Sequence, residues 1–457
     1  MAKTLDSRAA ALPLLAARLG AFAAATHYAS LPQDVAQAVK LRILDTIAAS
    51  ASGLLAGNAT RLLNLLQGDG PLPIWGARQG RGLRDAAIIN SALAHSTYFE
   101  DGSRYTGGHP SSAVIPATMA LAQARGASGR ALLEAVAVGY EVFLRLGHAI
   151  YPSTVRRGFQ STAILAAPAT AAAAANLLGL PAARAAHAVA IACSHGAGLK
   201  VALKSADSQP LQVGRSSEGG LLSAMYADQG ATGTPDIFEN GFLKAYADEA
   251  RADRAGAGLG ERWHIGETYV KVHGGCRGNH APVDAVAALV RAQGVTASRI
   301  ARLRVSVDTV TFAAAVEPPL NADQAQFSIG FSIAAMLVAG DATPARFTAS
   351  MLADPRVRAL MEKTDVRADN RLDAGYPDRR PAVVELTLED GSTLRHTLDH
   401  ALGEPENPMS PQDIVRKFET VAAGVHGAAV GPVRDTVLAL EALPAAGALG
   451  DLLRGAS

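Results

Sequence analysis

Apolar residues recur at helical spacing along the first half of the chain and change to strict alternation after about residue 263. In the first half, Val35, Val39, Ile43 and Ile47 repeat every four residues, which is the signature of one apolar helix face. The range 131–146 repeats this pattern, and Pro181 is placed to open a further helix. No convincing alternating strand is found before residue 263, so this half predicts an α-helical bundle.

The second half carries strand signals. Leu303, Val305 and Val307 alternate with polar residues, and the range 384–388 does the same, as expected of half-buried strands. Asp390-Gly391 follows the second run and is a strong hairpin signal. The range 264–272 is also β-prone, and helices are expected near 282–293 and 324–339.

These patterns predict a mainly α protein in which a smaller α+β lid domain is inserted into a large all-helical domain. We assign residues 1–263 to the first part of the helical domain, 264–400 to the lid and 401–457 to the C-terminal part of the helical domain. Ser410-Pro411 and Asp413 resemble an N-cap serine, a first-position proline and a first-turn acid. The C-terminal helices are therefore expected to rejoin the first domain.

Composition excludes several function classes. Lys+Arg is 42 and Asp+Glu is 41, so the chain lacks the basic excess that nucleic-acid binding favours. Cys193 and Cys276 are too few for a disulfide scaffold or for an ordinary cysteine-ligated iron–sulfur cluster. A reducing compartment is expected, and we predict a cytoplasmic location.

One stretch imitates a membrane span. The range 158–183 has no charged residue, but it is mostly alanine and contains Pro168, Asn176 and Gly179. Alanine drives membrane insertion weakly, so we expect a buried core helix and no membrane partner. The range 1–25 loosely resembles a transit peptide, and a plain first helix is the preferred interpretation.

The densest polar cluster of the first half runs from Glu100 to Ser112. It brings Asp101, Arg104 and His109 onto a Gly-rich loop, and sites often lie on loops carried by a rigid scaffold. The alternative is a solvated interhelical loop. His95 precedes the cluster in an apolar helical context and is interpreted as a core histidine.

A second cluster lies at the expected domain boundary, where ligand sites are common. Lys271 and Arg277 are candidates to hold carboxylates, and His273, Cys276 and His280 are candidates to move protons. The H-x2-C-x3-H spacing matches no common zinc site, so no metal is expected. A basic linker is the alternative interpretation.

A third stretch, 194–215, is rich in glycine and lysine and either clamps an anion or simply connects two helices. It contains no phosphate-binding loop pattern. The chain also has no nucleophile elbow and no dinucleotide-binding unit. Nucleotide chemistry is therefore not expected, and no cofactor is predicted.

Taken in order, these motifs resemble the MmgE/PrpD family over nearly the whole chain. The landmarks are Leu44-Asp45-Thr46, Asp101 through Ser111, Arg157-Gly158-Phe159, 177–180, Pro210-Leu211 with Gly214-Arg215, Lys271 through His280, Phe327-Ser328, and 403–410 with Lys417-Phe418. The family includes 2-methylcitrate dehydratases, cis-aconitate decarboxylases and iminodisuccinate epimerases. The resemblance implies a helical domain with an α+β lid, metal-free catalysis and a homodimer.

The resemblance also implies site residues. The active-site aspartate of the family resembles Asp101, its loop histidine His109 and its lid lysine Lys271, and a lid position that is His or Cys in members falls on Cys276. Three positions depart from the family pattern, because glutamine replaces a commonly basic residue at 160, 209 and 212. Gln160 and Gln209 are therefore expected to bind a substrate with fewer negative charges, or to alter the path of the proton.

We therefore predict a metal-independent lyase, a dehydratase or decarboxylase, that moves a proton at a carbon α to a carboxylate of a small di- or tricarboxylic acid. His109 is expected to be the base or acid with Asp101 as its partner, and Cys276 or His273 to serve the opposite face. Lys271 and Arg104 are expected to bind carboxylate. The alternatives are an epimerase or racemase of a small dicarboxylic acid and a non-catalytic carboxylate-binding homologue.

Overall fold

The computed structural model describes residues 14–57, 60–204 and 208–455. Most of these residues are helical, and one four-stranded sheet lies in the second half, so the predicted fold class is confirmed. The helices of the first half are α1 (Leu15–Ala25), α2 (Gln33–Leu55), α3 (Thr60–Leu65), α4 (Leu83–His95), α5 (Pro110–Arg125), α6 (Gly129–Ile150), α7 (Ser153–Arg156), α8 (Ser161–Leu177), α9 (Ala182–Ala192), α10 (Ser208–Asp228), α11 (Leu243–Tyr246) and α12 (Ala252–Gly256).

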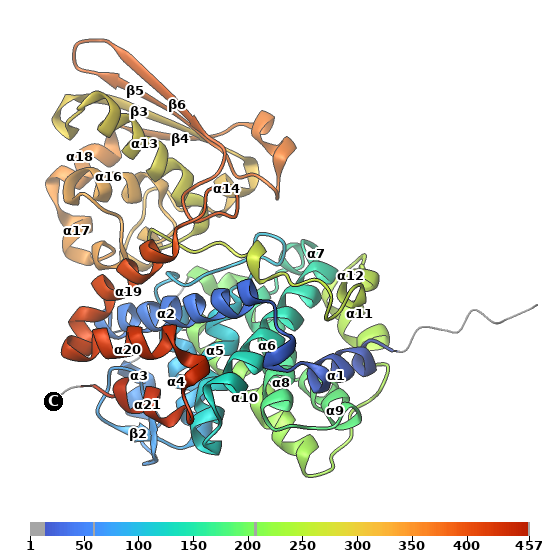
Figure 1. The fold of residues 1–457 in the computed structure, drawn as a ribbon. Coiled ribbons are helices and arrows are strands. Elements are labelled where there is room, and N and C mark those ends of the chain that lie inside the picture. The colour runs from blue at the N-terminus through green and yellow to red at the C-terminus, as the bar shows by residue number, and fades with distance from the viewer. Residues whose placement is uncertain (1–13, 58–59, 205–207, 456–457) are drawn as a thin grey trace, which may run out of the picture.

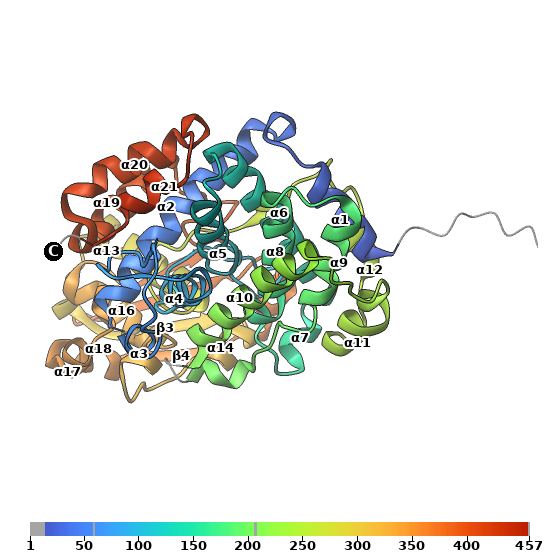
Figure 2. The ribbon, with the colours of Figure 1, turned by 90° about the horizontal axis from the view of Figure 1, so that it is seen from below.

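Helix α5 is the central helix of this bundle. Helices α2, α4, α6, α8 and α10 pack around it, as Figure 2 shows in a view from below. Small side chains let the helices approach closely, and every residue of α8 from Ser161 to Ala175 is buried. The uncharged stretch is therefore a core helix, as expected. Among the described residues, no helix is both long enough and apolar enough to span a bilayer.

The second half contains β3 (Ile300–Val307), β4 (Thr364–Ala368), β5 (Ala382–Leu388) and β6 (Thr393–Leu398). The strand order is β4-β3-β5-β6, with β4 parallel to β3 and the other pairs antiparallel. Alternate residues of β3 and β5 are buried beneath α13 (His280–Gln293) and α16 (Ile329–Ala339). The remaining helices here are α14 (Thr309–Ala314), α15 (Ala322–Ala325), α17 (Ala349–Ala353) and α18 (Pro355–Glu362).

Several local expectations hold, and three fail. The hairpin turns at Asp390-Gly391, where Gly391 has φ 83°. The range 264–272 is not a strand of the sheet, because its backbone bonds go to loop residues 102 and 403 instead. The range 324–339 is split between α15 and α16. The first half does contain strands, the two-residue pair β1 (Leu72–Pro73) and β2 (Gly80–Arg81).

The chain returns to the bundle at its C-terminal end. Ser410 caps α19 (Pro411–His426) in a capping box with Asp413, as predicted. Helix α19 packs on α2, followed by α20 (Val430–Leu438) and α21 (Gly447–Leu452) (Figure 1). The largest buried apolar cluster joins residues 15–265 with 418–453, and a separate one joins 281–401. The domain limits at 263/264 and 400/401 remain predictions, and residues 1–13 of the expected first helix lie outside the described ranges.

Candidate active site

The loop between α4 and α5 is shaped by two close contacts. Ser103 and Gly108 pair through the Ser103 amide, which donates to the Gly108 carbonyl at 2.9 Å. Gly107 has φ 62°, and a Cβ there would lie 2.8 Å from the Tyr151 ring. The loop therefore needs glycine at 107. The loop ends at His109, which is the last residue before α5, and Pro110 starts the helix.

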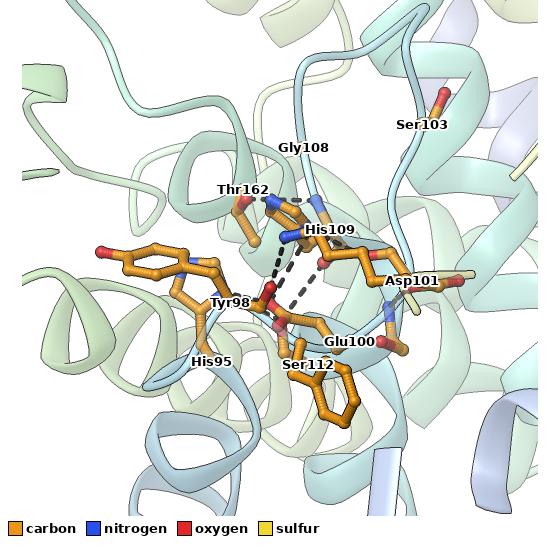
Figure 3. Close-up of polar contacts among 12 residues, drawn as sticks. His95, Tyr98, Glu100, Asp101, Ser103, Gly108, His109, Ser112 and Thr162 are labelled. Atoms are coloured by element: carbon orange, nitrogen blue, oxygen red, sulfur yellow. Dashed lines mark hydrogen bonds and ion pairs between the residues drawn. The ribbon is translucent and has the colours of Figure 1, made fainter. Parts of the chain in front are cut away.

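His95, Glu100 and His109 form one buried cluster (Figure 3). A Glu100 oxygen lies 2.5 Å from Nδ1 of His95 and 3.8 Å from Nδ1 of His109. The centres of the two imidazole rings are 5.3 Å apart. Burial alone would raise the pKa of Glu100, but His95 and His109, followed by Lys271, lower that pKa to about 2. Glu100 is therefore a buried anion that faces two imidazoles.

The hydrogen bonds of His95 fix its tautomer. The Gln160 side-chain oxygen accepts from the Ala163 amide at 2.5 Å, so its amide nitrogen faces Nε2 of His95 at 3.3 Å. The amide nitrogen of Gln209 lies 3.1 Å from the same Nε2. Amide nitrogens only donate, so Nε2 of His95 accepts and its Nδ1–H donates to Glu100. His95 is buried, as expected, but it belongs to the site.

His109 is held in the tautomer of a base. Its Nδ1 lies 2.6 Å from the main-chain oxygen of Asp101. Because a carbonyl oxygen can only accept a hydrogen bond, Nδ1 carries the proton of the neutral ring and Nε2 carries none. The side chain is 15% exposed. Burial, followed by the charge of Lys271, lowers the pKa of His109 to about 3. A neutral imidazole therefore presents a lone pair at the site.

Asp101 contacts His109 through its main-chain oxygen, and its carboxylate has other partners. Its carboxylate accepts from the Ser111 amide at 3.2 Å and from the Tyr140 hydroxyl at 3.1 Å, and it pairs with Arg42 at 3.2 Å. Burial raises the pKa of Asp101 to about 6, although Arg42 and Ser111 oppose that rise. The carboxylate thus anchors the loop, and only the backbone of Asp101 touches His109.

Lys271 reaches the same cluster from the segment after residue 264. Tyr269 and Gly102 exchange main-chain hydrogen bonds of 2.9 and 3.1 Å, which set this segment against the loop. The ammonium of Lys271, nearly fully buried, donates to the carbonyls of Tyr98 and Gly275 at 2.6 and 3.3 Å. Burial lowers the pKa of Lys271 to about 8, although Glu100 and Cys276 oppose that change. The segment of Lys271 therefore lies against the loop of His109, and the charge of Lys271 acts on His109.

Tyr98 contacts both Lys271 and Gln209, and the sequence does not predict it as a site residue. Among the described residues it is the one non-glycine with positive φ, at 48°. This conformation turns its carbonyl to Lys271, while its hydroxyl donates to the side-chain oxygen of Gln209. Backbone strain of this kind often occurs at functional sites.

The two arginines expected to bind carboxylate already have acidic partners. Arg277 donates to Glu404 at 3.0 Å, and Arg104 pairs with Glu406 at 3.0 Å. Arg104 also lies 3.7 Å from Glu404. The charges of both arginines are therefore largely compensated within the chain.

The other lid residues are spread more widely. Cys276 is a partly buried free thiol. His273 pairs with Asp284 at 2.9 Å, and His280 is fully buried without a hydrogen-bond partner, with its pKa held well below its usual value by burial. These three form no metal-ligand cluster in the described part of the chain. Among the residues that the structure describes, His148, His264 and Glu267 are the three close enough to share a metal ion, because their possible ligand atoms lie within 4.8 Å of one another.

The N-termini of three helices also point at the cluster. Helix α5 begins after His109, α8 begins after Gln160, and Gln209 lies in the first turn of α10. Helix N-termini carry partial positive charge and favour anions. Together with Lys271, they make the site suitable for an acidic ligand.

Both halves of the chain match models of one protein family. The model of the MmgE/PrpD N-terminal domain matches residues 17–255, and that of the MmgE/PrpD C-terminal domain matches residues 273–438. A cis-aconitate decarboxylase of Aspergillus terreus is 28% identical, over 93% of this chain and 94% of its own. Cis-aconitate decarboxylases of Homo sapiens and Mus musculus are 28% and 29% identical, covering 88% and 74% of this chain and 87% and 71% of their own.

Proposed function

The chain belongs to the MmgE/PrpD family, and from that premise we propose that it is a metal-independent lyase acting on a small polycarboxylic acid. The observation that carries the proposal is that a neutral imidazole, His109, and a buried cation, Lys271, both act on the same buried carboxylate, Glu100. A base beside a carboxylate-binding cation is what proton transfer at a carbon α to a carboxylate needs.

The arrangement supports the following chemistry. Lys271 holds a substrate carboxylate and stabilises negative charge that develops on it. In a dehydration, Nε2 of His109 takes the α-proton, and the imidazolium then gives that proton to the β-hydroxyl, which leaves as water as the C=C bond forms. Glu100 then stabilises the imidazolium that forms, because it lies 3.8 Å from His109.

Decarboxylation is the form of the reaction that the names of the relatives favour. The bond between carbon and the leaving carboxylate breaks, CO2 departs, and the electron pair stays on the organic acid until a proton reaches it. His109 supplies that proton only when it is charged. The carboxylates of a bound substrate favour the charged imidazole and so raise its pKa from the low value of the free site.

A screen by NMR in deuterated water tests the proposal. The enzyme is incubated with small di- and tricarboxylic acids, and His109→Gln serves as the inactive control. Release of CO2 identifies a decarboxylase, and loss of water identifies a dehydratase. Deuterium incorporation with inversion identifies an epimerase and overturns the lyase proposal. Binding without any exchange or turnover across the panel also overturns it and leaves a carboxylate-binding homologue.

A further inference from the structure

One further cation, Arg380, lies in the segment between β4 and β5. This segment docks on the helical bundle at three points. The hydroxyls of Tyr376 and Tyr151 are hydrogen bonded, the Tyr105 hydroxyl donates to the Asp378 carboxylate at 2.9 Å, and Arg104 donates to the Asp378 carbonyl at 2.6 Å. Arg380 follows two residues after Asp378 and lies over the ring of Tyr376, one of the residues at this contact.

Arg380 differs from the other arginines near the site, because it has no hydrogen bond or ion pair with any described residue. Its guanidinium lies over the Tyr376 ring, with 5.3 Å between the guanidinium carbon and the ring centre. Arg42, Arg104 and Arg277 are all paired with carboxylates. A partly buried guanidinium with no acidic partner is available to an acidic ligand.

Tyr376 and Tyr151 connect Arg380 to the loop that carries His109. The ring of Tyr151 packs on Gly107, two residues before His109, and the hydroxyl of Tyr151 reaches Tyr376. Cys276 lies within electrostatic reach of both Lys271 and Arg380. Asp308 also acts on Arg380, but its carboxylate is engaged in capping Thr311. Lys271 and Arg380 therefore approach Cys276 from two different segments of the chain.

The charged groups around His109 and Lys271 set how many carboxylates a ligand can carry. The side-chain amides of Gln160 and Gln209, which contact Nε2 of His95, carry no charge, and Glu100 is a buried anion. Within the described ranges, neither Lys271 nor Arg380 has an ion pair with a carboxylate. Two carboxylates match two cations, and a third would lie near Glu100 without a cation of its own.

We propose that Arg380 is a specificity-determining, substrate-binding residue that takes the second carboxylate of a small dicarboxylate whose first carboxylate is bound by Lys271. This inference rests on the proposed function, because it names the substrate class of the same site. A guanidinium binds a carboxylate through two parallel hydrogen bonds, which a lysine or an apolar side chain at 380 cannot reproduce.

Calorimetric binding of simple probes tests the inference independently of turnover. Succinate, butyrate and tricarballylate represent two, one and three carboxylates. The expectation is that wild-type enzyme binds succinate tightest and that Arg380→Met weakens succinate about 10- to 100-fold, the usual scale for a charge-assisted pair. Butyrate binding should not change, and Arg380→Lys should lose affinity to an intermediate degree.

Arg379→Met is the matched control. Arg379 is the exposed neighbour, 3.8 Å from Asp399, and its replacement should leave succinate binding unchanged. The inference is overturned if Arg380→Met leaves succinate binding unchanged, if it weakens butyrate equally, or if tricarballylate binds tighter than succinate. A turnover screen that fails while the binding pattern holds removes the lyase proposal alone. Turnover without any dependence of binding on Arg380 removes this inference alone.

Discussion

Lys417 of α19 joins the C-terminal helices to the candidate active site. Its ammonium pairs with Asp45 of α2 at 2.6 Å and donates to the carbonyls of Phe99 and Lys271, each at 2.8 Å. The same ammonium lies 3.7 Å from the centre of the Phe99 ring. One buried side chain therefore holds α2, the loop before His109 and the segment of Lys271 together.

Replacing Lys417 by methionine should be strongly destabilising. The substitution leaves the fully buried Asp45 without its cation, and breaking one side of a buried pair typically costs about 3–5 kcal/mol. Burial lowers the pKa of Lys417 in spite of the neighbouring Asp45, which indicates that desolvation weighs heavily on this pair. The double variant should therefore lose less free energy of unfolding than the two single variants together, by at least about 2 kcal/mol.

Urea unfolding of Lys417→Met, Asp45→Asn and the double variant measures this coupling. Lys40→Met is the matched control, because Lys40 also ties α2 to the C-terminal segment, through Glu441 at 3.1 Å, but Glu441 is 34% exposed. The control should lose about 1 kcal/mol or less. Turnover of the folded fraction should fall in Lys417→Met and not in the control. Losses that add within about 0.5 kcal/mol would refute the reasoning.

Three further predictions concern catalysis. His109→Gln should reduce kcat about 100-fold or more while the melting temperature stays that of the parent, and a near-parent rate would shift the catalytic role to the lid groups. Lys271 must be charged to hold a carboxylate and has a pKa of about 8, so kcat/KM should fall as pH rises through that value. In Lys271→Arg, any residual activity should lack this alkaline fall, and an unchanged alkaline limb in that variant would contradict the assignment. Dialysis against EDTA should leave turnover intact, and a loss restored by one divalent ion would contradict metal independence.

The sequence predicts the fold class because periodicity reports directly on buried faces. Strands β3 and β5 each bury one apolar face, helices α2 and α6 are buried on nearly all sides, and all four elements are predicted. Strand β4 is not predicted, because none of its residues is fully buried and no apolar alternation marks it. The range 264–272 has the composition of a strand but bonds to two loops, and only tertiary structure decides that outcome.

The site is predicted in part. The sequence identifies the His109 loop and the Lys271 segment, because each is a dense polar cluster. It does not identify Glu100 as the partner of His109, since adjacent acids at 100 and 101 look alike until the backbone shows which side chain faces the imidazoles. Arg104 and Arg277 are candidates by residue type, and only the structure shows that Glu404 and Glu406 already pair with them.

The bond from Lys417 to the Phe99 carbonyl also has a consequence during synthesis. His109 leaves the ribosome 308 residues before Lys417 (417 minus 109), which corresponds to about 15–60 s at typical elongation rates. Throughout that interval the face of α2 that α19 later covers is bare. Nascent chains should therefore be clients of chaperones until the last helices emerge, and a polypeptide truncated before α19 should be inactive and prone to aggregate.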